Sequence, residues 1–359
     1  MSEVQAKPEA APELEEANKG LVGRVQAIQG FQILVLLILV VAIFSVLEPG
    51  SFLTVNNLRT IVVNTSILAV LGVGMTFIII TGGIDLSVGS VLVFSGVVAS
   101  KTMTALGGEG WGVAIAGIIV SCLSGLAWGV LNGVLVSKAK VPPLIVTLGT
   151  LGMALGLAQI ITSGVDIRQV PAVLGDSIGY GRIGGQLPII VVISAVIVIL
   201  GIVLLHKTKT GLYTYSIGSN AEACRRVGIK VDRQLILVYG FAGLLAGVAG
   251  ILSLSYFQST TLSGQSTTNL NVIAGVVIGG TSLFGGIGSI FGTVMGLFVP
   301  SILQNGFVIL GIQPFWQQVV VGVVLIAAVF IDQRRREAAL RGRSSSGLLN
   351  KLLGKPSVQ

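Results

Sequence analysis

The sequence predicts an all-α, polytopic integral membrane protein with about ten transmembrane helices. Hydrophobic residues make up 53% of the 359 residues and charged residues only 10%, and the mean hydropathy is +0.94. Soluble domains carry about 25% charged residues, so this chain has too few to cover a globule in water. The 50 glycines are a second indication, because small residues allow the close helix packing that membrane bundles favour. The third is the recurrence of long apolar runs from residue 31 onward.

The two ends of the chain are polar and flank a predicted transmembrane domain at 31–332. Residues 1–30 carry acidic and basic side chains but neither an apolar core nor a small-residue cleavage site, which indicates a short cytoplasmic tail and not a signal peptide. Residues 333–359 are basic with a small leucine cluster, and we expect a disordered cytoplasmic tail that contacts anionic membrane lipid.

Ten apolar runs are long enough, or nearly so, to cross a bilayer. A helix needs about 20 apolar residues to span the hydrocarbon. The predicted spans lie near 31–47, 60–80, 86–106, 112–136, 143–163, 188–206, 235–255, 270–283, 287–310 and 313–331. The eighth is short, and the glycine-rich segments near 80–90 and 278–289 predict broken or re-entrant helices.

The positions of lysine and arginine predict the orientation. These residues collect at 138–140, within 207–233 and after the last span, while Lys19 and Arg24 precede the first. Cytoplasmic loops are rich in such residues, and all these groups fall on one side only if the number of spans is even. The ten predicted spans meet this condition and place both termini in the cytoplasm. The net charge of +8 follows from this topology, so we expect no nucleic-acid partner.

The stretch "ITGGIDLSVGS" at 80–90 places Asp85, the only acidic residue within the predicted spans, beside two glycines. Glycine can adopt the backbone angles that end a helix, and aspartate is a preferred N-cap. We expect the Asp85 carboxylate to accept from the amide of Ser87 or Val88 and so to start the next helix. Direct contact with a solute is the alternative. The two roles are compatible, because a broken helix is tolerated at membrane depth where it lines protein or water.

A second glycine-rich stretch resembles the first. The segment Gly82-Gly83-Ile84-Asp85-Leu86 is matched by Gly279-Gly280-Thr281-Ser282-Leu283, and each is followed shortly by Gly-Ser. In the predicted topology both lie at equivalent depth and direction, as parallel repeats require. Glycine-rich membrane sequence also produces such matches by chance, so duplication and coincidence both stay open.

The scarcity of ionisable residues in the spans limits the solute. Buried ionisable groups mark ion and proton pathways, but Asp85 has no visible partner and Lys101 can snorkel to an interface. A pathway would therefore suit an uncharged solute. Polar residues that could line it, or alternatively bridge helices, are Asn64, Thr65, Ser66, Asn132, Thr147, Thr150, Gln159, Gln304 and Asn305.

Catalysis and cofactor binding have little support in the sequence. His206 is the only histidine, and Cys122 and Cys224 lack metal-ligand spacing. No Gly-x-x-x-x-Gly-Lys-Ser/Thr sequence occurs, so the chain lacks a phosphate-binding loop of its own. We therefore expect no catalytic residue, metal or cofactor in this chain. Energy for uphill transport would have to come from a partner.

The predicted cytoplasmic coupling loop at 207–233 contains the stretch "GSNAEACRRVGIKVDR" at 218–233, which indicates a docking element. Ser219 and Glu222 have capping-box spacing, and Gly228 can close the other end of a helix. The predicted helix at 220–227 is too short to be stable alone in water. Docking into a groove of another protein explains this pattern better than an ordinary basic loop does.

Four segments occur in order between about Phe52 and Asp332: "GGIDLSVGS", "IGSNAEACRRVGIKV", "AGVVIGGTSLFGGIGSIFGT" and "PFWQQVVVGVVLIAAVFID". Together they resemble the permease subunit of bacterial monosaccharide ATP-binding-cassette importers of the ribose, xylose, arabinose and galactose type. The resemblance implies a homodimer of this chain that forms a pore for a neutral monosaccharide in the inner membrane. It also implies an ATPase subunit below, which binds ATP and magnesium, and a soluble sugar-binding protein outside.

The resemblance assigns residues as well. The ATPase-coupling helix of the family corresponds here to Ser219, Asn220, Ala221, Glu222, Ala223, Arg225, Arg226 and Gly228. Its signature turn, expected near the pathway, corresponds to Gly82, Gly83, Asp85, Leu86, Ser87 and Gly89. Cys224 stands where the family usually has alanine, and Asn269 and Asn271 stand where many members carry acidic residues. These departures keep small size or polarity, but they weaken the transfer of any particular sugar.

Aromatic residues make up only 6% of the chain, whereas tight sugar sites use aromatic stacking faces. We therefore expect this subunit to bind sugar weakly and the external binding protein to select it. A stand-alone channel or facilitator for small uncharged solutes is the alternative. It explains the uncharged spans but gives no purpose to the loop at 218–233. An intramembrane enzyme lacks a credible acid–base or metal group.

Overall fold

The computed structural model describes residues 29–263, 267–313, 315–316, 318–327, 329–330 and 333–334. The predicted tails at 1–30 and 333–359 lie almost entirely outside the described residues. The same is true of the basic residues that the orientation argument places there, Lys19, Arg24, Arg335, Arg336, Arg341 and Arg343.

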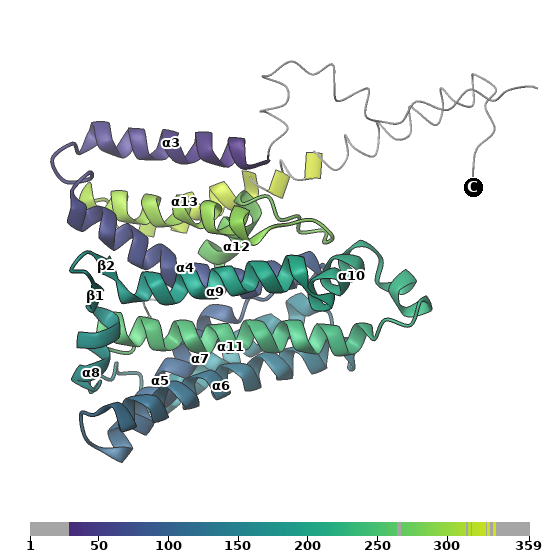
Figure 1. The fold of residues 1–359 in the computed structure, drawn as a ribbon, viewed down its shortest axis with the longest axis horizontal. Coiled ribbons are helices and arrows are strands. Elements are labelled where there is room, and N and C mark those ends of the chain that lie inside the picture. Colours follow the sequence, from purple (N-terminus) through teal and green to yellow (C-terminus); the bar gives the residue numbers. More distant parts are fainter. Residues whose placement is uncertain are drawn as a thin grey trace, which may run out of the picture.

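Helices dominate the described residues. Seven of them are long and apolar enough to cross a membrane: α4 (Val55–Ile80), α5 (Val88–Leu106), α6 (Trp111–Ser137), α7 (Pro143–Thr162), α9 (Ile189–Lys207), α11 (Val231–Phe257) and α13 (Ile290–Ile309). Three shorter apolar helical stretches are Ile33–Leu47 within α3 (Gln29–Leu47), α12 (Thr268–Ile278) and Gln318–Ala327. All ten coincide with the predicted spans, so the predicted fold class is confirmed. Helices α3, α9, α11 and α13 run along a common direction while α4 crosses them obliquely, as Figure 1 shows.

The core of the bundle lies around α4, α5 and α11. In the most apolar 18-residue stretch of α4, 89% of the residues are buried, whereas in the corresponding stretch of α9 only 22% are buried. Phe77 of α4 and Tyr239 of α11 are among the largest fully buried side chains. The peripheral helices α7 and α9 instead expose leucine and isoleucine side chains. Such faces are stable only against lipid or another apolar surface.

Small residues allow α6 and α11 to approach closely. On α6, Ser121, Gly125, Gly129 and Gly133 recur every fourth residue and face α11. A Cβ atom on Gly129 would clash with the Tyr239 carbonyl oxygen and lie 2.9 Å from the Gly243 Cα. This is the small-xxx-small packing of membrane helices, in which backbone meets backbone without intervening side chains.

A methyl group at Gly129 is therefore expected to push α6 and α11 apart. We predict that Gly129→Ala lowers the stability of the detergent-solubilised protein by about 1–3 kcal/mol, the usual penalty for overpacking. Gly112→Ala is the matched control, because a Cβ at Gly112 would meet nothing within 4 Å. Thermal unfolding of both variants is the measurement, and equal melting temperatures would contradict the packing described above.

The polar loops gather at the two ends of the bundle. At one end Asp232 forms ion pairs of 3.0 Å with Lys140 and with Arg225, so the basic segments 138–140 and 207–233 lie together, as predicted. The other end carries short elements that connect α7 to α9: α8 (Ala172–Leu174), the π-helix η1 (Gly175–Gly179) and a hairpin of β1 (Arg182–Ile183) with β2 (Leu187–Pro188). In this hairpin Arg182 is paired with Pro188.

Several boundaries differ from the prediction: α4 begins at Val55 and not at 60, and α11 begins at Val231 and not at 235. The eighth span ends at Ile278 and not at 283, because glycines at 279 and 280 terminate it. The predicted coupling loop at 207–233 begins with a helix, α10 (Lys209–Arg226). Thr208 caps it by accepting from the Gly211 amide at 3.3 Å. This helix was missed because its stability comes partly from tertiary contacts, such as the Gln234 side chain that donates to Thr214.

Candidate functional site

The first helix break follows α4 and is formed by glycine, as predicted. Gly82 has a φ of +80°, the left-handed region in which other residues are strained. Its amide donates to the Ile79 carbonyl at 2.9 Å, and the Gly83 amide donates to the Ile78 carbonyl at 3.1 Å. These two bonds form a Schellman motif, which satisfies the last carbonyls of a helix.

Asp85 closes the turn that follows. It is 3% exposed, and its Oδ1 atom accepts from the Ser87 amide at 2.7 Å and from the Ser87 hydroxyl at 2.6 Å. The predicted bond to the Ser87 amide is confirmed. The N-cap position is wrong, however, because α5 begins at Val88 and Ser87 occupies that position. Asp85 forms an Asx turn two residues earlier, since its short side chain reaches the second amide along the chain.

Three neighbouring helices hold this break in place. The Asn132 amide of α6 donates to the Ser87 hydroxyl at 2.9 Å, and Thr147 of α7 donates to the Ile84 carbonyl at 3.2 Å. The Gly89 amide in the first turn of α5 donates to Asn269 of α12 at 2.6 Å. Asn269 therefore caps α5 from a distant helix. In the sequence Asn269 stands out only as a departure from the family, because its partner Gly89 lies 180 residues away.

The second break, after α12, repeats the geometry of the first. Gly280 has a φ of +87°, and the amides of Gly280 and Thr281 donate to Val277 at 2.9 Å and Val276 at 3.2 Å. The structural equivalent of Gly82 is thus Gly280. The sequence match, which pairs Gly82 with Gly279, is displaced by one residue, because the helix end and not the glycine pair sets the register.

The short helix predicted at 220–227 is present, but it starts one residue later. Asn220 breaks α10 with a φ of −160° and a ψ of 96°, and its Oδ1 accepts from the Ala223 amide at 2.9 Å. Asn220 is therefore the N-cap, and the capping box predicted for Ser219 and Glu222 is wrong. Asparagine competes well with serine at this position. Glu222 instead forms an ion pair with Arg226, one helical turn away, in which its Oε1 atom lies 3.5 Å from the Arg226 Nε atom.

The end of this helix agrees with the prediction. Gly228 has a φ of +84°, its amide donates to Arg225 at 3.1 Å, and the Ile229 amide donates to Cys224 at 3.0 Å. Together these bonds form another Schellman motif. We call the segment from Asn220 to Gly228 the tip helix.

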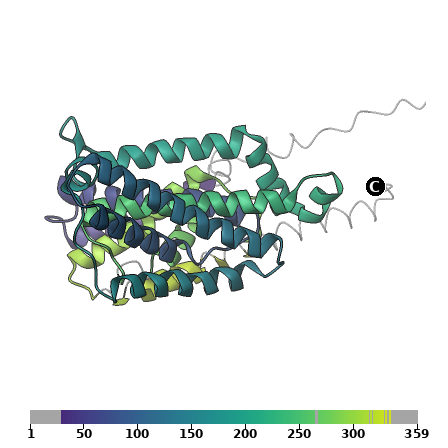
Figure 2. The same cartoon turned by 90° about the horizontal axis from the view of Figure 1, so that it is seen from below.

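The tip helix projects beyond the ends of the neighbouring helices, as Figures 1 and 2 show from two directions. Cys224 is buried and packs in a cluster with Ile217 and Val231, which fixes one face of the tip helix to the bundle. The opposite face is free in the described part of the chain: the Glu222 and Arg226 side chains are 65% and 78% exposed. The small side chain expected at position 224 is thus explained by packing.

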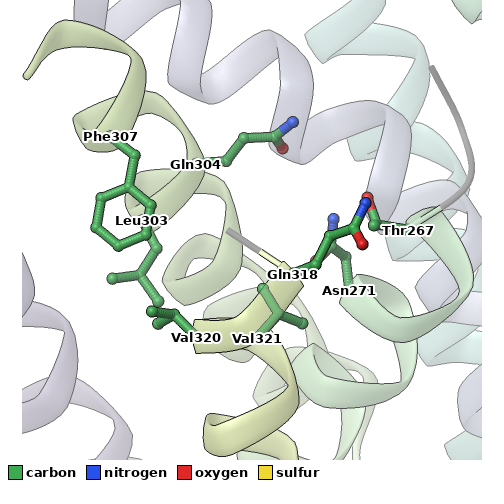
Figure 3. Close-up of a pocket in the computed structure, with 8 residues that line it drawn as sticks. All are labelled: Thr267, Asn271, Leu303, Gln304, Phe307, Gln318, Val320 and Val321. Atoms are coloured by element: carbon green, nitrogen blue, oxygen red, sulfur yellow. The ribbon is translucent and has the colours of Figure 1, made fainter. Parts of the chain in front are cut away.

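A polar hollow lies between α12, α13 and the stretch Gln318–Ala327. Figure 3 shows amide and hydroxyl side chains along one half of its wall and apolar side chains along the other. The polar residues are Thr267, Asn271, Gln304 and Gln318, and the apolar ones are Leu303, Phe307, Val320 and Val321. The Asn271 Oδ1 atom is buried and has no hydrogen-bond partner among the described residues.

The nine residues predicted as possible pathway lining do not converge on this hollow. Gln304 lines it, while Asn132 belongs to the first break. Asn305 donates to Asn57 of α4 at 2.8 Å, so it bridges two helices. Asn64 is half-buried on α4. Thr267 and Gln318 were not among the predicted residues, since nothing in the local sequence pattern places them beside Gln304.

Comparison with known proteins places the chain among transport permeases. The family described as the permease component of the branched-chain amino acid transport system matches residues 57–329. The ribose import permease protein of Escherichia coli strain K12 is 37% identical over 301 residues, which cover 82% of this chain and 91% of the relative. The ribose import permease protein of Bacillus subtilis is 37% identical over 302 residues (82% and 90%). The D-allose transport system permease protein of E. coli is 34% identical over 293 residues (82% and 88%). No solved structure matches the chain.

Proposed function

This chain belongs to the permease-component family of branched-chain amino acid transport systems, and on that premise we propose that it is the membrane-spanning subunit of an ATP-binding-cassette importer for a neutral monosaccharide. The observation that carries the proposal is its identity of 34–37% with ribose and allose permeases over 82% of its length. The nearly uncharged spans agree with a neutral solute. The chain is a transport subunit and not an enzyme.

The importer needs partners that supply energy and substrate. Accumulating a neutral solute a thousandfold requires about 4 kcal/mol. The chain has no phosphate-binding loop, so we propose that ATP and magnesium bind to a separate ATPase subunit. A sugar-binding protein would deliver the substrate from outside.

We propose that the tip helix docks onto the ATPase. Cys224 packs it against Ile217 and Val231, and its exposed face carries Glu222 and Arg226. Because the tip helix packs against the rest of α10 and against α11, movement of the tip helix would also move these helices, whereas an unpacked loop could move by itself. The basic residues near this end indicate that it faces the cytoplasm, with both termini on the same side of the inner membrane.

The pathway is proposed to pass the first helix break and the polar hollow. Amide groups both donate and accept hydrogen bonds, so Asn271, Gln304 and Gln318 suit the hydroxyl groups of a sugar. A second copy of the chain would complete the pathway, and lipid would cover the remaining apolar faces of α7 and α9.

Reconstitution of the whole importer tests this function. The chain, its ATPase and its binding protein would be placed in liposomes with a panel of ribose, allose, fructose, xylose, arabinose and galactose. We expect ATP-dependent accumulation of at least one of these sugars. Downhill flux through the chain alone, without nucleotide or partners, would favour the stand-alone facilitator instead.

The chain by itself is expected to bind sugar only weakly, with a dissociation constant well above micromolar. Among the described residues that line the polar hollow, only Phe307 is aromatic, which leaves few contacts to hold a sugar. Titration calorimetry of the purified chain with the same sugars is the measurement, and the binding protein serves as the positive control. Micromolar affinity of the chain alone would contradict this prediction.

A further inference from the structure

The two helix breaks touch each other at the end of α4. The Gly286 amide, in the loop after the second break, donates to the carbonyl of Ile80, the last residue of α4, at 2.8 Å. The neighbouring Gly285 has a φ of +82°, and a Cβ atom there would lie 3.0 Å from the Gly82 amide. One loop is therefore in direct backbone contact with the other.

Helix α10 packs onto this same contact, just before the tip helix begins. A Cβ atom on Gly218 would clash with the Ile80 carbonyl oxygen and lie 2.6 Å from the Gly286 nitrogen. A Cβ atom on Gly286 would lie 3.4 Å from the Ser219 Cα. Only a residue without a side chain allows α10 to reach both breaks at once.

A side-chain hydrogen bond fixes this arrangement. The Tyr215 hydroxyl of α10 donates to the Gly288 carbonyl at 2.7 Å. Burial raises the pKa of the Tyr215 phenol, so this group stays protonated and able to donate at neutral pH. Tyr215 lies one helical turn before Ser219, and Asn220 follows directly as the N-cap of the tip helix. The same short segment thus carries the tip helix and holds the second break.

We propose that Tyr215 and Gly218 are positioning residues that transmit displacement of the tip helix to both helix breaks simultaneously. The proposal rests on the function proposed above, in which the tip helix meets the ATPase. Because the contacts are backbone against backbone, a shift of α10 cannot be absorbed by side-chain rotation and must move Ile80 and the Gly286 loop together. The first break leads into α5 and the second into α13, which also lines the polar hollow, so their movement would alter the pathway.

We call this transmission of movement through Tyr215 and Gly218 the relay. Two variants test it in the reconstituted importer. Gly218→Ala inserts a methyl group into the contact, and Tyr215→Phe removes only the hydroxyl. Gly112→Ala and Tyr213→Phe are the matched controls; no hydrogen bond of the Tyr213 hydroxyl is seen in the described part of the chain. Three quantities are measured for each: binding of the ATPase, stimulation of ATP hydrolysis by the binding protein, and ATP hydrolysed per sugar imported.

We expect both variants to bind the ATPase normally but to hydrolyse more ATP for each sugar imported. The ATP hydrolysed per sugar should rise at least about fivefold in Gly218→Ala, since overpacking displaces the contact, and by less in Tyr215→Phe. Stimulation by the binding protein should fall in parallel, whereas both controls should match the unmodified importer. A structural role alone would lower the amount of assembled importer without changing this ratio.

Either of two results would overturn the relay. One is an unchanged ratio and unchanged stimulation in both variants. The other is loss of ATPase binding, which would place these residues in the docking surface. If the importer that carries Gly218→Ala does not assemble, the result for Tyr215→Phe alone decides whether the relay is kept or rejected. An unmodified importer that moves none of the sugars would count against the proposed function, while the relay would still be read from the stimulation of ATP hydrolysis.

Discussion

Glu222→Lys is expected to abolish ATP-driven sugar uptake while the protein still inserts into the membrane. The Glu222 side chain is 65% exposed, and its pair with Arg226 is a surface contact that adds little to stability. The helix should therefore survive the substitution. At a docked interface, however, an inverted charge costs about 2 kcal/mol or more, which weakens ATPase binding at least about thirtyfold.

Glu48→Lys is the matched control, because it makes the same chemical change at the end of α3, at the opposite end of the bundle. Co-purification of the ATPase and uptake by the reconstituted importer are measured for both variants. Glu48→Lys should retain the ATPase. Full uptake by the Glu222→Lys importer would rule out the tip helix as the docking element. Arg225→Glu is a poorer test, since Arg225 also pairs with Asp232 and its reversal would disturb the anchor of the tip helix.

Asp85→Ala is expected to destabilise the start of α5 and to reduce uptake at least about tenfold. The substitution leaves the Ser87 amide and hydroxyl without their acceptor at a site where Asp85 is 3% exposed. Each buried donor without a partner costs about 1–3 kcal/mol. Thermal unfolding and uptake are the measurements. Asp176→Ala is the control, because it removes an exposed carboxylate from η1, between α7 and α9.

Asp85→Asn separates the two roles that the sequence left open. Its amide oxygen can still accept from Ser87, so a purely structural Asp85 predicts uptake and stability close to those of the unmodified protein. A stable Asp85→Asn protein without uptake would instead favour direct contact between the carboxylate and the sugar.

The candidate site was predictable where the signal is local. Gly82 and Gly228 end helices because their own backbone angles are accessible to glycine, and this can be read one residue at a time. The choice between Ser219 and Asn220 as N-cap could not be predicted, because both residue types suit that position. The path of α10 decides between them. Asn269 shows the same limit: it accepts from the amide of Gly89, 180 residues earlier, and no local pattern reveals that partner.

The sequence by itself determined that this is a multispanning membrane subunit, where its apolar helices lie, which glycines interrupt them and which short segment projects from the bundle. These features depend on hydropathy and on the conformational range of single residues. Only the tertiary structure decided that Gly218, Ile80 and Gly286 meet, that Asn269 caps α5, and that Gln304 shares a hollow with Asn271. Such contacts arise from helix packing, which joins residues far apart in the chain through shape that no local pattern encodes.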